Sequence, residues 1–350
     1  MGTILCRRFE KKDEPSMVEL YKQVLGSVRS SEWLDWKYYK NPAGDHDIQV
    51  AEVDGEVVGS LGIRAMRAKI EEQEISACHV CDLMIKNDFR RGTFMRLSKA
   101  ATRDYEGKGR LFVYGTSVKD TLLLSVKLLG FATAGPIKRL VRILDPTPYL
   151  QRKLKFRPLA RILGLLGAFY LELRHWRSMK TAPDYLIKKV DRVDERFDEL
   201  WQRRRDDYEI SIVRDTTYLR WRYFQNPVQT YTVLAAEKEG RLEGFIVVCL
   251  RVGFINRGFI VDMLADPSDD ELCRSLLSEA LRFLGRLGVN NVSCWWLEHM
   301  PAFDICRQMG FVVQETNHDL IVRTHNDRWD NDFLSERRRW YFCFGDTDHV

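Results

Sequence analysis

Part of this chain occurs twice within its own sequence. Residues 34–59 and 219–244 align without a gap, 185 positions apart (219 minus 34). The identical pairs are Leu34/Leu219, Trp36/Trp221, Tyr38/Tyr223, Asn41/Asn226, Pro42/Pro227, Ala51/Ala236, Glu52/Glu237, Gly55/Gly240 and Gly59/Gly244. A repeat constrains the fold more than any single motif, because both copies are expected to form the same unit.

A second set of identities extends the repeat. Four more pairs lie 180 positions apart (262 minus 82): Asp82/Asp262, Leu97/Leu277, Gly130/Gly310 and Phe131/Phe311. One insertion or deletion between the two sets accounts for the change of spacing. We therefore expect one domain over 1–135, a basic connection over 136–190 and a second copy of the domain over 191–350.

The composition is compatible with two packed domains. The chain has 350 residues, of which 45% are hydrophobic, and its 18 Phe, 13 Tyr and 9 Trp can fill two cores. A disordered chain is therefore excluded. The net charge of +5 is too small to indicate a nucleic-acid partner by itself.

The sequence pattern predicts a mixed α/β unit in each copy. In the first copy, Asp54-Gly55 lies between two alternating runs, which is a strong hairpin signal. The expected elements are a helix over 16–29, strands over 48–53, 56–66, 67–74 and 76–85, a helix over 91–107, a strand over 111–116 and a helix over 119–129. In the second copy we expect the same order, with later helices over 270–287 and 301–309. Helices packed on a central sheet are the expected architecture.

The segment 136–190 is strongly basic, with thirteen Lys or Arg against three Asp or Glu. Its apolar run LARILGLLGAFYLEL (159–173) is too short and too charged to span a bilayer. Three interpretations stay open. The segment is a linking helix packed on both domains, a helix lying on a membrane surface through 138–180, or a nucleic-acid patch, and the last is the least favoured.

The eight cysteines do not form a disulfide framework. The N-terminal sequence MGTILCRRFEKKDEP becomes charged at once, so we expect no secretory signal. We therefore expect a cytoplasmic protein with reduced thiols, which could also be associated with the inner face of the membrane. Cys78 and Cys81 form a CxxC pair, but no second pair accompanies them. We therefore expect buried small side chains rather than a metal site.

The shared segment Trp-Lys/Arg-Tyr-x-x-Asn-Pro, the strand–helix–strand–helix order and the closing Leu-Gly-Phe resemble the GNAT superfamily of N-acetyltransferases, most closely its tandem-domain bacterial members. The resemblance covers about 30–135 and again 205–315. It implies two tandem GNAT-like mixed-sheet α/β domains. It also implies acetyl-CoA, or another acyl-CoA, as the acyl donor.

The resemblance places the coenzyme at CDLMIKNDFRRGTFMRL (81–97). The residues implied to bind it are Leu83, Met84, Ile85, Arg90, Arg91, Gly92, Thr93 and Phe94. A helix N-terminus offers unpaired N–H groups to a phosphate, Gly lets the backbone come close, and Arg adds charge. This turn departs from the family pattern, because only one residue separates Arg90 from Gly92 and a bulky Phe94 replaces a small residue. The second copy has ADPSDDELCRSL (265–276) at this place, with no Gly and four acidic residues, so we expect no coenzyme there.

Three residues are candidates for catalysis. Asp82 is either a general base or a structural acceptor, the second because it recurs as Asp262. The Tyr that often protonates the leaving thiolate in the superfamily is replaced by Val126 here. Tyr114 or Ser117 could donate instead, although Tyr114 also suits a core and Ser117 a helix cap.

We therefore expect an acyl-CoA dependent N-acyltransferase. The resemblance favours a primary amine of a small molecule as acceptor, such as an amino sugar or a surface-polysaccharide precursor. One alternative is an aminoacyltransferase similar to the Fem family, which draws on aminoacyl-tRNA. The other is a catalytically degenerate GNAT pair that acts as a binding module.

Overall fold

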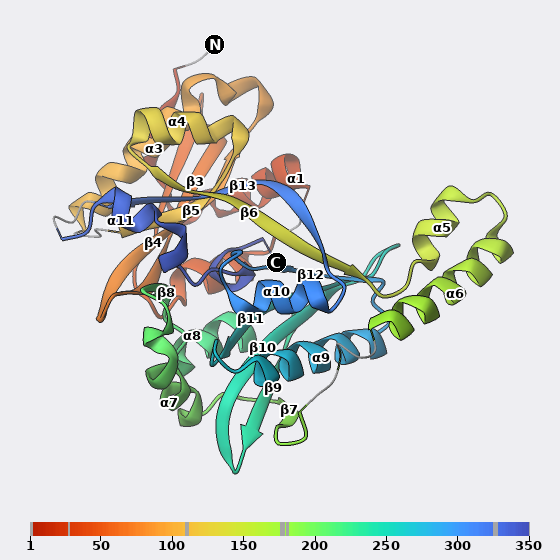
Figure 1. Ribbon diagram of the computed structural model, residues 1–350. Helices are drawn as coiled ribbons and strands as arrows, with labels where there is room; N and C mark the ends of the chain where they lie inside the picture. The colour runs from red at the N-terminus through yellow and green to blue at the C-terminus, as the bar shows by residue number, and fades with distance from the viewer. Residues whose placement is uncertain are drawn as a thin grey trace. The chain divides into compact units, whose positions relative to one another are not determined.

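The computed structural model describes residues 3–26, 29–108, 112–175, 179, 182–324 and 328–349 (Figure 1). It contains two compact units. Unit 1 comprises Met1–Pro136, Gln225–Val228 and Asn317–Arg339, and unit 2 comprises Ile137–Phe224, Gln229–Thr316 and Trp340–Val350. The segment 136–190, expected as a connection, thus lies almost wholly within unit 2.

Unit 1 is built on a mixed sheet in the order β1-β2-β3-β4-β5-β13. Its strands are β1 Leu5–Arg8, β2 Asp47–Val53, β3 Glu56–Ile70, β4 Gln73–Ile85, β5 Phe112–Val118 and the end of β13 Val312–Thr324. Neighbouring strands are antiparallel except for β4 and β5, which are parallel. A crossover connection is needed between parallel strands, and a helix supplies it here.

The helices of unit 1 are α1 Glu14–Leu25, α2 Ser31–Leu34, α3 Arg90–Gly107, α4 Lys119–Leu129 and α11 Asn331–Ser335. The crossover helix α3 packs on β2 and β3, and α1 packs on β3 and β4. Leu97, Ala101 and Tyr105 follow each other at four-residue spacing along α3 and are all buried in the core. This spacing places them on one face of the helix, so α3 is fixed on the sheet with its first turn at the end of β4.

Unit 2 repeats this element order. Its sheet runs β6-β12-β11-β10-β9-β7, with β6 Ala132–Ile143, β7 Leu186–Val190, β9 Tyr231–Lys238, β10 Arg241–Arg251, β11 Arg257–Ala265 and β12 Asn291–Trp295. The parallel pair is β11 and β12. The short strand β8 Ile210–Ile212 and the helices α5 Thr147–Lys153, α6 Arg157–His175, α7 Glu195–Arg204, α8 Thr216–Leu219, α9 Asp270–Arg286 and α10 Pro301–Gln308 complete the unit.

The last strands of the two copies are exchanged. β6 follows Gly130-Phe131 of the first copy, yet its residues 139–143 pair with β12 of unit 2. β13 follows Gly310-Phe311 of the second copy, yet its residues 318–324 pair with β5 of unit 1. This exchange explains why the units are discontinuous in sequence and why 317–339 belongs to unit 1.

The predicted turns are mostly confirmed. Asp54 and Gly55 both have positive φ, of 50° and 85°, and join β2 to β3 as a hairpin. Gly130, with φ of 70°, ends α4 as expected. The expected break between 66 and 67 is wrong, because β3 continues to Ile70 and turns at Glu71. The helix predicted over 16–29 begins earlier and ends at Leu25, because Gly26 takes a left-handed conformation; positions 27 and 28 lie outside the described residues.

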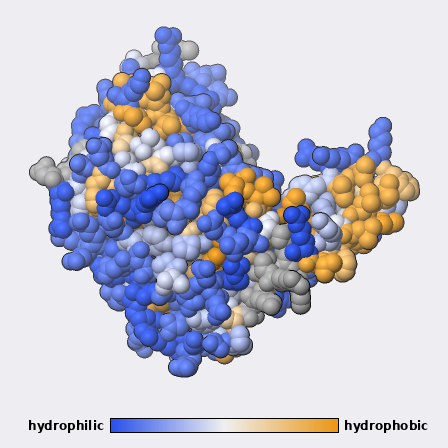
Figure 2. Space-filling view, in the orientation of Figure 1, coloured by the Kyte–Doolittle hydropathy of each residue, from blue (hydrophilic) through white to orange (hydrophobic). Residues whose placement is uncertain are grey.

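Helix α6 of unit 2 leaves most of its apolar side chains exposed. Ala160 and Gly164 form a narrow buried face, with Gly164 against Thr147. The exposed large side chains are Leu159, Ile162, Leu163, Leu165, Leu166, Phe169, Tyr170 and Leu173, and they appear as a hydrophobic patch over α6 in Figure 2. Within unit 2, this face of α6 is therefore not packed against other elements. Among the described helices, none is long and apolar enough to cross a membrane.

Candidate active site

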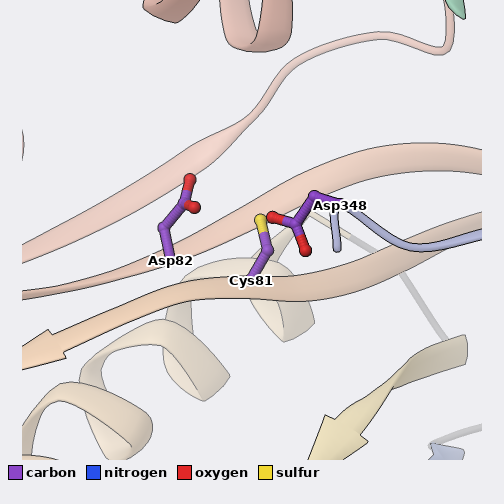
Figure 3. A group of neighbouring side chains, drawn as sticks. All are labelled: Cys81, Asp82 and Asp348. Atoms are coloured by element: carbon purple, nitrogen blue, oxygen red, sulfur yellow. The ribbon is translucent and has the colours of Figure 1, made fainter. Parts of the chain in front are cut away.

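The repeated carboxylate Asp82 lies at an irregularity in β4. The register against β3 shifts between Ser60 and Gly62, and Asp82 has a positive φ of 50°. This is a β-bulge, which places an extra residue on one strand and redirects its side chains. Figure 3 shows Cys81 and Asp82 at this point of β4, with Cys81 Sγ and a carboxylate oxygen of Asp82 within 4.8 Å of each other. The third labelled residue in that view, Asp348, belongs to unit 2.

A buried lysine and a buried tyrosine hold the Asp82 carboxylate. Lys37 Nζ lies 2.6 Å from Asp82 Oδ2, and the Lys37 side chain is fully buried. The Tyr38 hydroxyl donates a short hydrogen bond to the same oxygen. Burial first, and then the charge of Asp82, raise the pKa of Tyr38 well above its ordinary value, so the hydroxyl stays protonated and remains a donor. Lys37 and Tyr38 come from one π-helical turn, Asp35–Tyr39.

Unit 2 repeats the contact between Tyr and Asp at the matching positions, but its cation comes from a different position in the sequence. Tyr223 donates to Asp262 Oδ2 at 2.7 Å, as Tyr38 does to Asp82. Arg214 Nε lies 2.9 Å from Asp262 Oδ1, and Arg214 Nη2 lies 2.7 Å from Asp346 Oδ1. All of these charged side chains are fully buried. The repeated Tyr and Asp thus tie the aromatic turn to a bulged strand in both units.

The parallel pairing of β4 with β5 ends before either strand does. Ala77–Val80 lie opposite Phe112–Gly115, and no pairing across the two strands follows, although β4 continues to Ile85 and β5 to Val118. β5 stays paired with β13 up to Val118. Beyond Val80, just before the bulge at Asp82, the ends of β4 and β5 are therefore no longer paired.

The turn after β4 forms an exposed, cationic helix start. Within α3, Arg91 has ψ of 112° and Gly92 has φ of 79°, so regular helix begins only after Gly92. No side chain caps this end of the helix. Arg90, Arg91 and Gly92 are exposed, and neither arginine side chain forms a hydrogen bond or ion pair with any described residue. Uncapped N–H groups beside two free guanidinium groups suit an anion.

The remaining coenzyme candidates lie more deeply. Met84 and Ile85 are buried and still pair with β3, while Leu83 is half-buried. Thr93 is fully buried, and its hydroxyl donates to the carbonyl of Phe89. Phe94 is half-buried against the core of unit 1. The side chains free to meet a ligand at this turn are therefore those of Arg90 and Arg91.

The structure does not bring Tyr114 or Ser117 into contact with Asp82. Tyr114 is fully buried before the strands part, with its ring centroid 5.0 Å from that of His79. Ser117 lies beyond the parting, but it is buried, and its hydroxyl lies 2.9 Å from Thr121 Oγ1 at the start of α4. Lys37 and Tyr38 were missed as partners of Asp82. A signal was available for the tyrosine, which recurs together with the Asp in both copies. It was not available for Lys37, because its counterpart Arg222 bonds to the carbonyl of Thr347 instead.

In unit 2, the helix start at the matching position is capped and acidic. Asp269 accepts from the N–H of Leu272 at 2.8 Å and so caps α9. Asp270 and Glu271 occupy its first turn, and Arg204 forms an ion pair with Asp266. Acidic groups at this place stabilise the helix but repel phosphate.

The parting of β11 and β12 in unit 2 is also occupied. Their pairing ends at Phe259 opposite Ser293. The C-terminal segment 340–347 lies against both strands: Phe344 stacks on Trp295 of β12 with centroids 4.4 Å apart, and Tyr341 donates to the carbonyl of Met263 on β11. In unit 2, the C-terminal segment thus packs where the two parallel strands part.

Comparison with known proteins agrees with this geometry. Residues 6–122 match the family model of the acetyltransferase (GNAT) domain. No curated protein matches the sequence. The first part of the chain thus matches a GNAT acetyltransferase domain.

Solved structures share the fold at low sequence identity. A probable N-acyltransferase of unknown function from Enterococcus faecalis is 11% identical, with a TM-score of 0.62 over 92% of this chain and 73% of that one. A GCN5-related N-acetyltransferase from Anabaena variabilis is 13% identical, with a TM-score of 0.62 over 93% and 73%. N-myristoyltransferase from Saccharomyces cerevisiae, solved with bound myristoyl-CoA, is 12% identical, with a TM-score of 0.63 over 97% and 88%.

Proposed function

We propose that unit 1 binds an acyl-CoA where β4 and β5 part and transfers the acyl group to a primary amine. The observation that carries this proposal is the start of α3, which is uncapped, exposed and flanked by Arg90 and Arg91. The pyrophosphate of the coenzyme would accept hydrogen bonds there. Bound in this way, the coenzyme supplies an activated thioester.

The reaction balances without any further reagent. The amine nitrogen attacks the thioester carbonyl carbon, the C–N bond forms and the C–S bond breaks. The amine gives up one proton and the sulfur leaves as a thiolate, which takes up a proton to give the free thiol. The residues of the chain have to bind the donor, orient the amine and provide a path for the proton.

We assign Asp82 a positioning role. Its carboxylate is shared by Lys37 and Tyr38. A tyrosine and a buried cation also hold Asp262 in unit 2, where the helix start is capped. Asp82 would then fix the bulge from which the end of β4 departs. Asp82→Asn should lower kcat while the pH dependence of kcat/KM keeps its shape. Loss of the acidic limb of that profile, where an essential base becomes protonated, would instead make Asp82 the general base.

Binding of the coenzyme tests the proposal directly. We expect calorimetry with acetyl-CoA to show one site per chain, and Arg91→Glu to weaken it by about 100-fold, because a charge-assisted contact is replaced by repulsion. Arg103→Glu is the matched control, since Arg103 is exposed near the other end of α3. Equal affinity of both variants, or no binding by the wild-type chain, would overturn the proposal.

The acceptor we propose is a small-molecule primary amine, such as an amino sugar. Release of the free coenzyme thiol can be followed against a panel of amino sugars, amino acids and polyamines. If the chain retarded tRNA in a gel mobility-shift assay and did not bind the coenzyme, an aminoacyltransferase would be favoured. The same panel with longer acyl-CoA donors would define the length of the acyl group.

We also propose that α6 rests on an anionic membrane surface. Its exposed apolar side chains recur at three- and four-residue spacing, and α5 and α6 with their connection carry Arg152, Lys153, Lys155, Arg157, Arg161 and Arg174 against one acid, Glu172. An apolar face with basic flanks is typical of interfacial helices. Phosphatidylglycerol vesicles should co-sediment the wild-type chain at low salt. Leu166→Glu should abolish this, whereas Leu123→Glu on α4, where the leucine is equally exposed (59% against 61%), should not.

A further inference from the structure

A cavity of about 670 Å³ lies beside α6 within unit 2. Its walls come from the end of β6, the second half of α6 and the end of α9. Most of the lining is apolar, with Leu144, Phe169, Leu171, Leu281 and Val289 among it. Its size falls within the range of about 300–1,000 Å³ that is usual for small-molecule sites.

One charged side chain in this lining is buried without a partner. Arg142 of β6 is only 4% exposed. Its Nε and Nη1 atoms are fully buried and have no hydrogen-bond partner among the described residues. Burial lowers the pKa of Arg142 to about 10, so the guanidinium remains charged at neutral pH.

The neighbouring charges do not neutralise Arg142. Glu172 of α6 also lines the cavity, but it is exposed and forms no ion pair with Arg142. Arg282 and Arg286, on the α9 side, both bond to Glu279. Asp145 is engaged by the N–H of Thr147 and the amide of Asn290. An unpaired buried guanidinium is costly, so an anion that enters the cavity would relieve this cost.

The apolar wall of the cavity continues onto the outside of α6. Phe169 lines the cavity and is also 66% exposed as part of the apolar face of α6. Figure 2 shows hydrophobic side chains over α6. The cavity therefore suits a ligand that combines an anionic group, which would pair with Arg142, and an acyl chain, which would contact the apolar wall.

We propose that this cavity binds the phosphate headgroup of a lipid. The Arg142 guanidinium would pair with the phosphate, and the apolar lining would surround the start of the acyl chains. The site is separate from the proposed acyl-CoA site of unit 1. It also does not require that α6 lies on a bilayer, because a monomeric short-chain lipid can fill it.

The test uses the full chain and dihexanoyl phosphatidic acid, a soluble lipid, in calorimetric titrations. We expect saturable binding by the wild-type chain and a loss of about 10- to 100-fold in affinity for Arg142→Gln, since a hydrogen bond to a charged group is removed. Arg139→Gln is the matched control, because Arg139 lies on the same strand and is exposed. Arg91→Glu should bind the lipid normally, which separates this site from acyl transfer.

Three results would overturn the proposal. The first is a wild-type chain that does not bind the lipid, and the second is equal binding by Arg142→Gln. The third is inorganic phosphate binding as tightly as the lipid, which would make the cavity a site for a free anion. Thermal unfolding gives an independent readout: without ligand, Arg142→Met should raise Tm, because it removes an unpaired buried charge. A lower Tm would show that Arg142 serves the fold rather than a ligand.

Discussion

The two units share one framework and differ in what occupies it. In both, a tyrosine from an aromatic turn donates to an aspartate on a bulged strand, and a buried cation completes the group. In unit 1 the adjoining helix start is exposed and cationic. In unit 2 it is capped by Asp269, and the C-terminal segment fills the parting of the strands.

This difference separates residues that maintain the fold from residues that serve the site. Groups present in both units, such as Tyr38 and Asp82, are explained by the shared framework. Groups present only in unit 1, such as Arg90, Arg91 and Gly92, are not needed to build the unit, because unit 2 is built without them. We therefore expect the specific function to depend on the residues that are present only in unit 1.

The largest effect we predict comes from removing the cation of unit 2. Arg214→Met would leave Asp262 and Asp346 buried without a counter-charge, and should lower the free energy of unfolding by about 3–5 kcal/mol. Lys37→Met leaves only Asp82 unpaired and should cost less. Urea unfolding followed by tryptophan fluorescence measures both.

A surface pair provides the control for this prediction. Lys40 and Asp35 form an ion pair with both side chains exposed, so Lys40→Met should change stability by less than about 1 kcal/mol. If Arg214→Met were no more costly than Lys40→Met, the buried group would not be a shared framework, and the comparison between the units would lose its basis.

The sequence predicts the local features of this fold better than its long-range ones. The Asp54-Gly55 hairpin and the end of α4 at Gly130 depend on backbone conformations that few residues adopt, so they are legible from the residues themselves. The exchange of β6 and β13 between the two units cannot be predicted from the sequence. Both strands follow a Gly-Phe pair, and their partners are decided by packing between segments far apart in the chain.

The candidate site was predictable in part for the same reason. The cationic turn at 90–92 is a local pattern, and it lies on the surface of unit 1. Asp82 lies about 45 positions from Lys37 and Tyr38 in the sequence. Their contacts also depend on a β-bulge that no residue type in the sequence predicts. The C-terminal segment resembles a strand in sequence, but it packs as an irregular segment with one helical turn, Phe344–Asp346, because its aromatic side chains fill unit 2.

Acidity should affect the two units differently. Burial raises the pKa of Asp346 from 3.8 to about 6, although Arg214 opposes the shift. Between about pH 4 and pH 6 the unfolded chain has lost this proton while the folded chain still holds it, so the contribution to stability falls as the pH rises, by up to about 3 kcal/mol. Asp346→Asn should remove this fall.

Urea unfolding of the wild-type chain and Asp346→Asn at pH 4.5, 5.5 and 6.5 measures the difference. The variant should gain stability relative to the wild type as the pH increases. Asp304→Asn, at an exposed carboxylate of α10, should show no such trend. A variant curve parallel to the wild type would mean that Asp346 titrates as it does in the unfolded chain.

The smallest effect we predict concerns the shape of the helix start that only unit 1 retains. Gly92 has φ of 79° and nothing within 4 Å of the place of a β-carbon, so Gly92→Ala meets no clash and is opposed by backbone conformation alone. We expect it to cost about 1–2 kcal/mol of stability and to weaken acetyl-CoA binding, since the turn that aims the N–H groups must change. Gly107→Ala in the same helix is the control, because Gly107 has helical backbone and open space, and alanine there should stabilise the chain by up to about 1 kcal/mol. If Gly92→Ala lost stability but bound acetyl-CoA as the wild type does, the left-handed turn would serve the fold of unit 1 rather than its site, and the arginines alone would distinguish that site.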